Sequence, residues 1–594
     1  MNVMRIITLL LLLFGLLIPS ASFAEKEFSV GLDVTYRFDK EGVSQVEQIV
    51  TITNLTQYMY AGNYEMNLSG DTPKNIKAWD DGGQMKIDEI FESGQTKIKV
   101  NFNNPVAGRD RKYQFHLSYL GRPAIHNGQV WEVSFPRLAN ADEIDSYRLS
   151  VIIPKSFGRL AFSSPNPESN NGEIMVITHN QGVQYGVVAA FGDFQTYEFN
   201  LSYTIDKSQA ISLPSDSGYQ RIFYDNIEPM PDNITIDIDG NWLAYYEVKS
   251  KDKKSIKVSG RANILSESSQ FIPSVGYHDL TKYTKPTTYW PSDNEKFFNL
   301  AKTYKTPKEI YEFVVKTLKY DKSKKPLRSG AIAALSNPET ALCTEFTDLF
   351  ITMSRAAGIP ARELNGFAYT SNPELRPLSL SGIDVLHAWP QYWDFAKSTW
   401  ISVDPTWEVT TKGIDYFSKM DFNHFAFVSH GVSDTEPRSA GFYKLSGDET
   451  KSVDVKFGEF KDYQALPLEL KVEWPWQIWA PLGANAKLII KNPNSYALYR
   501  TSVRINHLEI STIDVLPPFS THKIDYQINP NWNLNFDTKK LELEAGISKL
   551  TYNIKVSSYF VWHATVAIFS SFILILLGFI ASRIWSLHLQ RQSV

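Results

Sequence analysis

The sequence predicts a multidomain α+β protein in which β-sandwich domains flank a central core that contains helices, and one transmembrane helix follows. Three observations predict this fold class. Segments that alternate apolar and polar residues fill 28–204 and return between 451 and 557. Helical periodicity occurs only in the middle of the chain. At 594 residues the chain is too long for one hydrophobic core, so roughly three to five domains are expected.

The composition excludes some classes of protein. Sixty Lys and Arg residues against 64 Asp and Glu residues give a net charge of −4, so no basic excess indicates a nucleic-acid partner. Cys343 is the single cysteine, so the chain cannot form an internal disulfide. Export without disulfides is more typical of a bacterial or archaeal exterior than of a eukaryotic lumen.

Export is indicated by the first 24 residues, which have the parts of a secretory signal peptide. Arg5 precedes an apolar run, Pro19 breaks that run, and small residues lead to a cleavage site after Ala24. An uncleaved membrane anchor is the alternative, but the apolar run is short for a bilayer.

A membrane-spanning helix is predicted at Phe560–Ser582. These 23 residues contain no acid, Lys or Arg, and they are long enough for a hydrocarbon layer of ~30 Å. Trp562 and Trp585 fall near the two interfaces, and Arg583 and Arg591 predict a cytoplasmic tail. The protein is therefore expected in the cell membrane as a single-pass protein, with its N-terminal ectodomain outside the cytoplasm.

The N-terminal region is expected to form a β-sandwich, because strand patterns such as VWEVSF and YRLSVIIP are separated by turns such as DDGG. A second β segment follows it. Its DIDGN sequence (237–241) weakly resembles a calcium loop, but the EF-hand spacing and terminal Glu are absent, so a hairpin turn is predicted. No metal site and no cofactor is predicted.

Two helices are predicted in the central region. TPKEIYEFVVKTLKY begins with Thr306 as N-cap, Pro307 at the first helical position and Glu309 three residues after the cap. A second, buried helix is indicated by apolar residues at helical spacing over 346–357, with a stop at Gly358.

The single cysteine lies where this second helix begins. Cys343 falls at its first turn or one residue before it, where unpaired N–H groups and the helix dipole stabilise a thiolate. Glu345 and Asp348 oppose that effect, so a basic partner is needed to activate the thiol.

A hairpin after this helix supplies the partner. Two strand patterns meet at a predicted turn, Asp394–Lys397. If Trp393 pairs with Ser398, His387 lies directly opposite Asp404, and opposed residues have Cβ atoms roughly 4.5–5.5 Å apart. At that distance the carboxylate can orient the imidazole.

Cysteine, histidine and aspartate in these positions predict a catalytic triad. The imidazole of His387 takes the thiol proton, Asp404 orients the ring, and Cys343 attacks a carbonyl carbon to form a thioester. The backbone N–H of Cys343 is the expected first oxyanion donor. Taken singly, the cysteine could be a small buried apolar residue, Asp404 a turn cap, and His424 a rival histidine that is structural or lines the cleft.

The segments CTEFTDLFITMSRAAGIPARELNGF, LHAW and WISVDPTW resemble, in this order, the three core motifs of the transglutaminase-like superfamily. The resemblance implies a papain-like core with Cys343, His387 and Asp404 as its catalytic residues. It also implies protein or peptide substrates. The N-terminal β region, through DGNWLAYYEV, is similar to domains that precede this core in exported prokaryotic members, and the C-terminal sandwich is expected to be Ig-like.

The resemblance also reveals a missing residue. Papain-like enzymes commonly supply the second oxyanion contact from a Gln before the cysteine, and transglutaminases from a Trp. Between Lys322 and Leu342 the only side-chain amide belongs to Asn337, which is therefore the candidate donor. Tyr369 and Trp389 are candidates for the substrate cleft.

Two classes of function follow. The first is a cysteine acyl-transfer enzyme that acts on protein or peptide amides, as a protease or amidase when water accepts the acyl group and as a cross-linker when an amine does. The alternative is a catalytically weak or inactive core that serves as a binding or structural protein at the cell surface.

The expected boundaries are a signal peptide at 1–24, a β-sandwich at 25–205, a second β segment at 206–270, the transglutaminase-like core at 271–432, the Ig-like β-sandwich at 433–558, the transmembrane helix at 560–582 and the cytoplasmic tail at 583–594.

Overall fold

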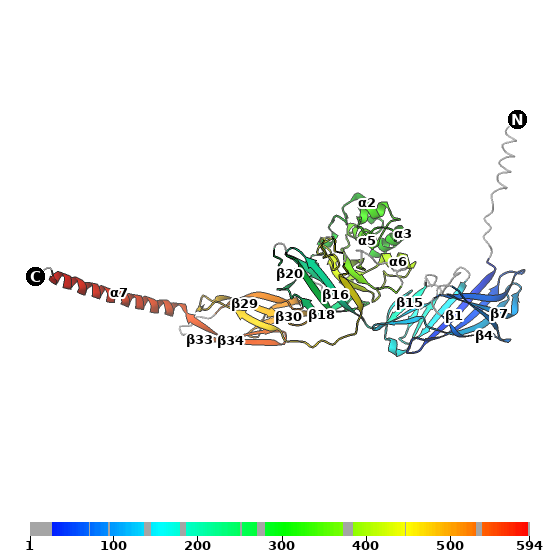
Figure 1. The fold of residues 1–594 in the computed structure, drawn as a ribbon, viewed down its shortest axis with the longest axis horizontal. Helices are drawn as coiled ribbons and strands as arrows, with labels where there is room; N and C mark the ends of the chain where they lie inside the picture. The colour runs from blue at the N-terminus through cyan, green and yellow to red at the C-terminus, as the bar shows by residue number, and fades with distance from the viewer. Residues whose placement is uncertain are drawn as a thin grey trace, which may run out of the picture. The chain divides into compact units, whose positions relative to one another are not determined.

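The computed structural model is a multidomain, mostly β protein with helices concentrated in its central region and at its C-terminus (Figure 1). Residue contacts divide the chain into two units, Met1–Asp193 with Thr411–Asp415, and Phe194–Thr410 with Tyr416–Val594. The predicted signal peptide lies outside the described residues. The structure describes residues 26–69, 72–92, 95–135, 144–178, 186–249, 252–269, 279–371, 384–445, 447–448, 450–529 and 537–591.

The first unit is built from three sheets on one hydrophobic core. Their strand orders are β13-β14-β11-β1-β2-β8-β4-β5, β12-β15-β10-β9 and β3-β7-β6. Burial alternates along strands such as β2, as expected for a sheet with one face on the core. The strands are β1 Phe28–Phe38, β2 Ser44–Asn54, β3 Tyr60–Ser69, β4 Lys74–Asp80, β5 Gly83–Gln84, β6 Lys86–Glu92, β7 Gln95–Ala107, β8 Lys112–Gly121, β9 Ala124–Asn127, β10 Val130–Phe135, β11 Ile144–Ile152, β12 Leu160–Ser164, β13 Ser169–Asn170, β14 Ile174–Thr178 and β15 Val187–Phe191, with the short helix η2 at Lys155–Phe157.

The second unit begins with two sheets, β18-β21-β16-β26 and β17-β20-β19. β16 lies in the range expected for the N-terminal sandwich, and β26 in the range expected for the C-terminal one, yet the two strands pair with each other. The DIDGN segment joins β19 to β20, which confirms the predicted hairpin turn. The strands are β16 Gln195–Ile205, β17 Gln209–Leu213, β18 Gln220–Glu228, β19 Ile234–Ile236, β20 Trp242–Tyr246, β21 Lys254–Ile264 and β26 Val453–Phe457.

The central region packs helices against one face of the antiparallel sheet β24-β23-β22-β25. Helix α5 is buried along almost its whole length and contacts α2, α3, α4, β22 and β23. The capping box predicted for α3, formed by Thr306 and Glu309, is confirmed. The elements are η5 Leu280–Thr284, α2 Glu295–Ala301, α3 Pro307–Thr317, α4 Gly330–Ser336, α5 Cys343–Ala356, β22 Ala361–Ala368, β23 His387–Asp394, β24 Thr399–Ser402, α6 Pro405–Thr411 and β25 His424–His430.

Two further sheets, β27-β29-β32 and β28-β34-β33-β30-β31, share one apolar core after this region. Their strands are β27 Glu469–Glu473, β28 Ile478–Ala480, β29 Ala484–Lys491, β30 Leu498–Ile505, β31 Leu508–Leu516, β32 Thr521–Ile528, β33 Asp537–Ala545 and β34 Ser548–Ser558.

A long apolar helix, α7 (Tyr559–Arg591), follows β34 directly. Within Tyr559–Leu589, an 18-residue window reaches a mean hydropathy of 2.5, and none of that window is buried in the protein. By length and composition this segment is a candidate membrane span. It contains the whole predicted range 560–582 and continues beyond it.

Candidate active site

Cys343 is the first residue of α5. Leu342 precedes it in an extended conformation, so the chain turns into the helix at the thiol. The cysteine is only 1% exposed. Farther along α5, the hydroxyl of Thr347 donates to the carbonyl oxygen of Ala388 at 3.3 Å, which ties the helix to β23 beside His387.

His387 and Asp404 are hydrogen-bonded to each other. Nε2 of His387 lies 2.9 Å from Oδ2 of Asp404, and neither side chain is exposed. The other carboxylate oxygen accepts the backbone N–H groups of Thr406 and Trp407, at 2.9 and 3.1 Å. Asp404 therefore caps the N-terminus of α6 and orients the imidazole with the same carboxylate.

The contact between His387 and Asp404 does not depend on the predicted strand register. Trp393 pairs with Trp400 instead of Ser398, so the predicted register is wrong by two residues. The turn begins one residue later, with Ser398 at a positive φ of 50° and the carboxylate of Asp394 accepting backbone N–H groups inside it. A two-residue shift keeps every side chain on its face of the sheet. Asp404 lies beyond β24 and reaches His387 as a helix cap, not as an opposed strand residue.

The second ring nitrogen of His387 faces the thiol side of the site. Nδ1 is buried and forms no complete hydrogen bond with the described residues, while Cys343 lies near enough to influence the ring electrostatically. Burial would lower the pKa of His387, but the charge and hydrogen bond of Asp404, with a contribution from Cys343, raise it to about 9. Burial would raise the pKa of Asp404, but His387 holds it well below its ordinary value.

Aromatic rings enclose this imidazole. Trp389 and Trp407 stack on His387 with ring centres 5.9 and 5.2 Å away and interplanar angles of 18° and 19°. Trp389 is buried, so it forms a wall behind the histidine. Tyr369 is half-buried just after β22 and packs edge-on against Phe457 at 4.5 Å.

Asn337 is not brought to these residues. It is exposed at the C-cap of α4, where its backbone N–H donates to Ala333 and its carbonyl oxygen accepts from Thr340. Its backbone thus ends a helix, and its side chain lies in solvent, whereas Cys343 is buried.

A residue that the sequence interpretation missed lies nearer to the thiol. Tyr320 forms a parallel bridge with Ala341, and Ala341 also exchanges backbone hydrogen bonds with Lys319 and Asp321. The half-buried Tyr320 forms no hydrogen bond through its hydroxyl with any part of the chain that the structure describes. Burial, together with the charges of Cys343 and nearby acids, raises its pKa well above the ordinary value, so the hydroxyl keeps its proton.

The acid nearest the thiol in the helix, Glu345, is neutralised. Its Oε2 accepts the backbone N–H of Leu342 at 2.9 Å and pairs with Lys324 at 2.8 Å. Its Oε1 accepts both the backbone N–H and the hydroxyl of Ser329, each at 2.8 Å. The expected opposition of this carboxylate to a thiolate at Cys343 is therefore weakened by an ion pair.

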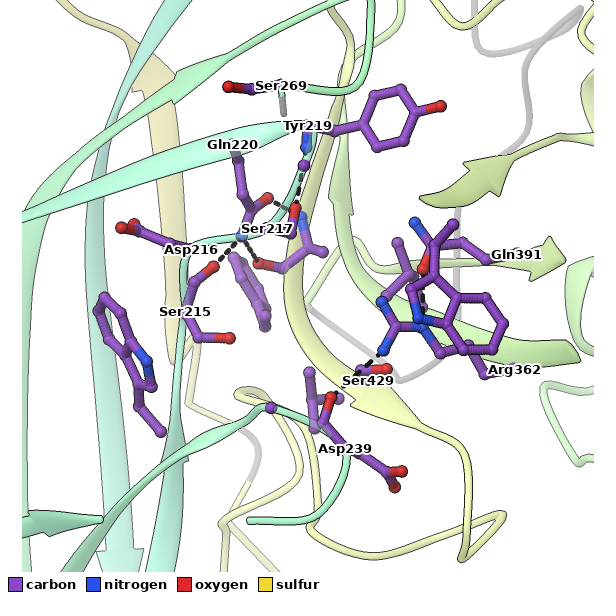
Figure 2. A pocket seen from close by; sticks show the side chains of 18 of the residues that line it. Ser215, Asp216, Ser217, Tyr219, Gln220, Asp239, Ser269, Arg362, Gln391 and Ser429 are labelled. Atoms are coloured by element: carbon purple, nitrogen blue, oxygen red, sulfur yellow. Dashed lines mark hydrogen bonds between the residues drawn. The ribbon is translucent and has the colours of Figure 1, made fainter. Parts of the chain in front are cut away.

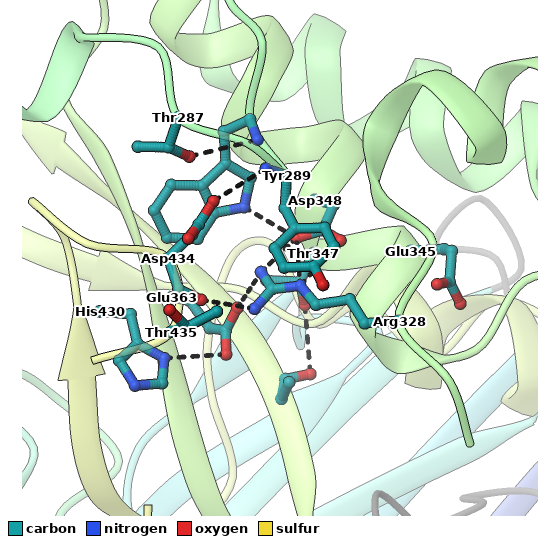
Figure 3. Close-up of polar contacts among 12 residues, drawn as sticks. Thr287, Tyr289, Arg328, Glu345, Thr347, Asp348, Glu363, His430, Asp434 and Thr435 are labelled. Carbon is teal, nitrogen blue, oxygen red and sulfur yellow. Dashed lines mark hydrogen bonds and ion pairs between the residues drawn. The ribbon is translucent and has the colours of Figure 1, made fainter. Parts of the chain in front are cut away.

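Asp348 is neutralised by Arg328, as Figure 3 shows. The guanidinium lies between Asp348 and Glu363, and the indole N–H of Trp290 donates to Asp348 at 2.8 Å. Glu363 in turn contacts Nδ1 of His430 at 3.2 Å. The network is buried and joins α5 to β22 and β25.

A cavity of about 330 Å³ borders the first turn of α5. Leu342 and Thr344, the residues on either side of the thiol, both line it. Its other walls include Tyr289, Arg328, His430, Arg438 and Phe442.

A second pocket, shown in Figure 2, is lined by residues of several strands, among them Arg362 of β22, Gln391 of β23 and Ser429 of β25. Arg362 projects into it, donates to Gln391 at 2.8 Å and to the backbone oxygen of Asp239 at 3.2 Å, and stacks on Trp400. None of the predicted triad residues lines this pocket.

Three of these side chains are also of the types that bind metal ions. Ligand atoms of His387, Asp404 and His424 lie within 4.8 Å of one another. Both histidine contacts to Asp404, at 2.9 and 3.2 Å, are direct hydrogen-bond distances. Hydrogen bonding is therefore sufficient to account for the cluster.

A cysteine at a helix start beside a buried His–Asp pair is the arrangement of a cysteine acyl-transfer centre. Residues 295–405, which include Cys343, His387 and Asp404, match the core of the transglutaminase-like superfamily. The chain therefore contains a transglutaminase-like core.

One curated relative is a protein-glutamine gamma-glutamyltransferase of Pseudomonas aeruginosa, 34% identical over 95 residues. The match covers 15% of this chain and 14% of that protein, so the chain spans only a small part of the relative. A candidate cysteine protease from Cytophaga hutchinsonii aligns over 45% of this chain and 87% of its own, with 15% identity and a TM-score of 0.29. The periplasmic domain of TgpA from Pseudomonas aeruginosa, bound to ethylmercury, aligns over 38% and 94%, with 15% identity and a TM-score of 0.22.

Proposed function

We propose that this protein is a membrane-anchored, extracytoplasmic cysteine acyl-transfer enzyme that acts on protein or peptide amides. The observation that carries the proposal is the juxtaposition of a helix-start thiol, Cys343, with the buried His387–Asp404 pair. The match of residues 295–405 to the transglutaminase-like core supports the same chemistry.

The reaction would proceed in two halves. His387 takes the thiol proton at Nδ1, and Sγ of Cys343 forms a bond to the amide carbon while the carbonyl oxygen gains negative charge. The C–N bond then breaks as His387 returns the proton to the leaving nitrogen, which leaves a thioester. Water or an amine, deprotonated by His387, attacks the thioester carbon. The C–S bond then breaks with Cys343 as the leaving thiolate, and His387 returns the proton to it.

The oxyanion formed in both halves needs hydrogen-bond donors. The backbone N–H of Cys343, at the first position of α5, is one of the N–H groups that a helix leaves without an intrahelical acceptor. As the second donor we propose the hydroxyl of Tyr320 instead of the side chain of Asn337, because an isolated bridge pairs Tyr320 with Ala341, two residues before Cys343. The cavity that borders Leu342 and Thr344 is the expected approach for a substrate.

The proposed location, outside the cytoplasm and anchored in the membrane, rests on α7 and on residues 1–24. α7 is the proposed anchor, with Trp562 and Trp585 at the interfaces and the tail after Arg583 in the cytoplasm. Residues 1–24 are the proposed export signal. The acyl-transfer centre would then face proteins outside the cytoplasm.

Alkylation tests the proposed nucleophile directly, because a chain with one cysteine reports a single site. At mildly acidic pH, full-length protein in detergent should react with iodoacetamide at least about a hundredfold faster than His387→Ala, since the imidazole supplies the thiolate. His522→Ala, an exposed histidine on β32, is the matched control and should react like the wild type. Equal, slow labelling of the wild type and His387→Ala would contradict the proposal.

A second assay separates the two acceptors. A glutamine-containing peptide incubated with the protein should release ammonia. With an added primary amine, incorporation of the amine identifies transfer, whereas unchanged release of glutamate identifies hydrolysis.

A second candidate function is a catalytically weak or inactive core that holds a partner at the cell surface. The burial of Cys343 and His387, at 1% and 0% exposure, favours it, because a substrate cannot reach the thiol without movement of the surrounding chain. Slow labelling that does not depend on His387 would support this candidate over the enzyme.

A further inference from the structure

A second buried histidine contacts the same carboxylate oxygen as His387. His424 begins β25, and its Nε2 lies 3.2 Å from Oδ2 of Asp404. On the other side of the ring, Nδ1 lies 3.0 Å from Oδ1 of Asp421. Both nitrogens of one imidazole therefore face carboxylates, and the side chain is only 4% exposed.

The surroundings identify both carboxylates as ionised acceptors. Asp404 already accepts two backbone N–H groups at the start of α6. Asp421 accepts the backbone and side-chain N–H groups of Asn423 at 3.0 and 3.1 Å, and the hydroxyl of Tyr416 lies 3.4 Å away. An ionised carboxylate has no proton to donate. A neutral His424 would therefore direct a ring lone pair at one of them inside the protein, which is costly.

We propose that His424 is a doubly protonated imidazolium whose charge positions Asp404 and weakens the hold of Asp404 on the proton of His387. This inference rests on the proposed function, because it gives His424 a part in the proton transfers of Cys343. Burial alone would lower the pKa of His424, but the charge of Asp421 and the hydrogen bonds to both carboxylates raise it to about 9.

The charge matters because the reaction needs His387 both to accept and to release a proton. A carboxylate beside the ring favours acceptance from the thiol and opposes release to the leaving nitrogen. The ring centre of His424 lies 5.7 Å from that of His387. A fixed positive charge at that distance lowers the pKa of His387 and so brings the two transfers nearer to balance. His424 acts through Asp404 and is therefore a positioning residue.

Two variants remove the charge in different ways. His424→Gln keeps an amide donor beside Asp404 without a charge. Asp421→Asn leaves His424 as a neutral ring that still donates from Nε2, because the new amide can donate to Nδ1. The two variants therefore separate the charge from the hydrogen bond.

The measurement is the pH dependence of alkylation by iodoacetate, an anion whose approach is favoured while His387 is protonated. The rate of labelling should fall at high pH as His387 loses its proton. In full-length His424→Gln this fall should occur about one pH unit higher than in the wild type, because the loss of a neighbouring positive charge raises the pKa of His387. The shift should have the same sign and be smaller in Asp421→Asn, where a negative charge is lost as well.

His116→Gln is the control. His116 is half-buried on β8, a strand of the other unit, where it stacks on Trp79 with ring centres 5.2 Å apart. The pH dependence of labelling in this variant should match that of the wild type. The inference is overturned if, in both test variants, the pH at which labelling falls is the same as in the wild type or lower. A labelling rate that changes on addition of a chelator also overturns it, because a metal ion would then occupy the cluster.

A second measurement does not depend on the thiol. Nitrogen-15 NMR of histidine-labelled protein, assigned with Asp421→Asn, should show both ring nitrogens of His424 protonated between about pH 6 and pH 8. A neutral ring overturns the inference whatever the alkylation shows. The NMR could show a doubly protonated His424 while labelling of Cys343 does not depend on His387. That result would overturn the proposed function and the role of His424 in it, but the positive charge of His424 would stand. If His424→Gln fails to fold, Asp421→Asn and the NMR decide.

Discussion

Two buried groups of charged side chains contact α5, and they differ in how completely their polar atoms are paired. The thiol cluster consists of Cys343, His387, Asp404, Asp421 and His424. In it, Nδ1 of His387 has no complete hydrogen bond among the described residues. The remaining imidazole nitrogens of this cluster all contact carboxylates.

The arginine cluster consists of Arg328, Asp348, Glu363 and His430. Arg328 donates to both carboxylates and to the backbone oxygen of Asp434, and both nitrogens of His430 are bonded. No buried side-chain atom of these four described residues lacks a partner. Because an unpaired buried polar atom costs free energy, the arrangement indicates that the arginine cluster stabilises the fold, whereas the thiol cluster leaves Nδ1 of His387 without a hydrogen-bond partner among the described residues.

The largest expected effect on stability is from Arg328→Gln. The substitution leaves Asp348 and Glu363 buried without their cation, which should lower the free energy of unfolding by about 3–5 kcal/mol. Part of the loss should be relieved by protonation, because burial already raises the pKa of Asp348 to about 7 although Arg328 lowers it. Exposure of the single thiol to a bulky reagent along a urea series measures unfolding of the core.

Lys319→Gln is the control for this comparison. Lys319 forms an ion pair with Glu339 at 2.9 Å, but both side chains are mostly exposed, so its loss should change the urea midpoint little. Native-state alkylation of Cys343 should fall only slightly in Arg328→Gln, because the uncompensated Asp348 opposes a thiolate only until it is protonated. A large fall in that rate, with the midpoint preserved, would reverse the roles assigned to the two clusters.

The thiol cluster should instead make stability depend on pH. His387 has a folded-state pKa of about 9, above its ordinary value, so its stabilising contribution is complete below about pH 6.5 and is lost as the pH rises through 9. By 1.36 kcal/mol per pKa unit, the loss is at most about 3 kcal/mol. Urea midpoints measured across this window should fall with rising pH in the wild type and fall less in His387→Gln. Equal slopes would mean that His387 is neutral in the folded protein.

Much of the local structure could be predicted from the sequence, because it depends on neighbouring residues. Apolar spacing and the stop at Gly358 placed the helix that begins at Cys343, and the Thr306–Glu309 capping box held. The pairing of β16 with β26 could not be read in this way. Those strands are separated by the whole helical core, and no local period records which distant strand completes a sheet edge.

The candidate site shows the same division. The proximity of His387 and Asp404 was predicted from a symmetric hairpin, and the register of that hairpin is wrong by two residues. The two side chains meet because Asp404 lies beyond the hairpin strand and caps the following helix. The contact of His424 with Asp404 depends on the pairing of β25 with β22. Tyr320 was missed because a single bridge to Ala341 brings it near the cysteine. Its only sequence signal is that it is an aromatic residue at the end of a predicted helix.

The smallest effect, and the sharpest test of the thiol cluster, is expected for Tyr320→Phe. Loss of one oxyanion donor should slow acylation by a p-nitrophenyl ester about a hundredfold. Alkylation forms no oxyanion, so the rate with iodoacetamide should stay within a few-fold of the wild type. The comparison of the two rates therefore separates a donor to the oxyanion from a residue that merely supports the thiolate.

Tyr304→Phe is the matched control, because Tyr304 is also half-buried in the helical core but packs on Phe313, away from the bridge to Ala341. It should leave both rates unchanged. Parallel losses of acylation and alkylation in Tyr320→Phe would show that the hydroxyl acts on the thiol itself. Full acylation activity would exclude Tyr320 as the donor, and the backbone N–H of Cys343 would then need another partner. A selective loss of acylation would place Tyr320 among the residues that contact the reacting atoms.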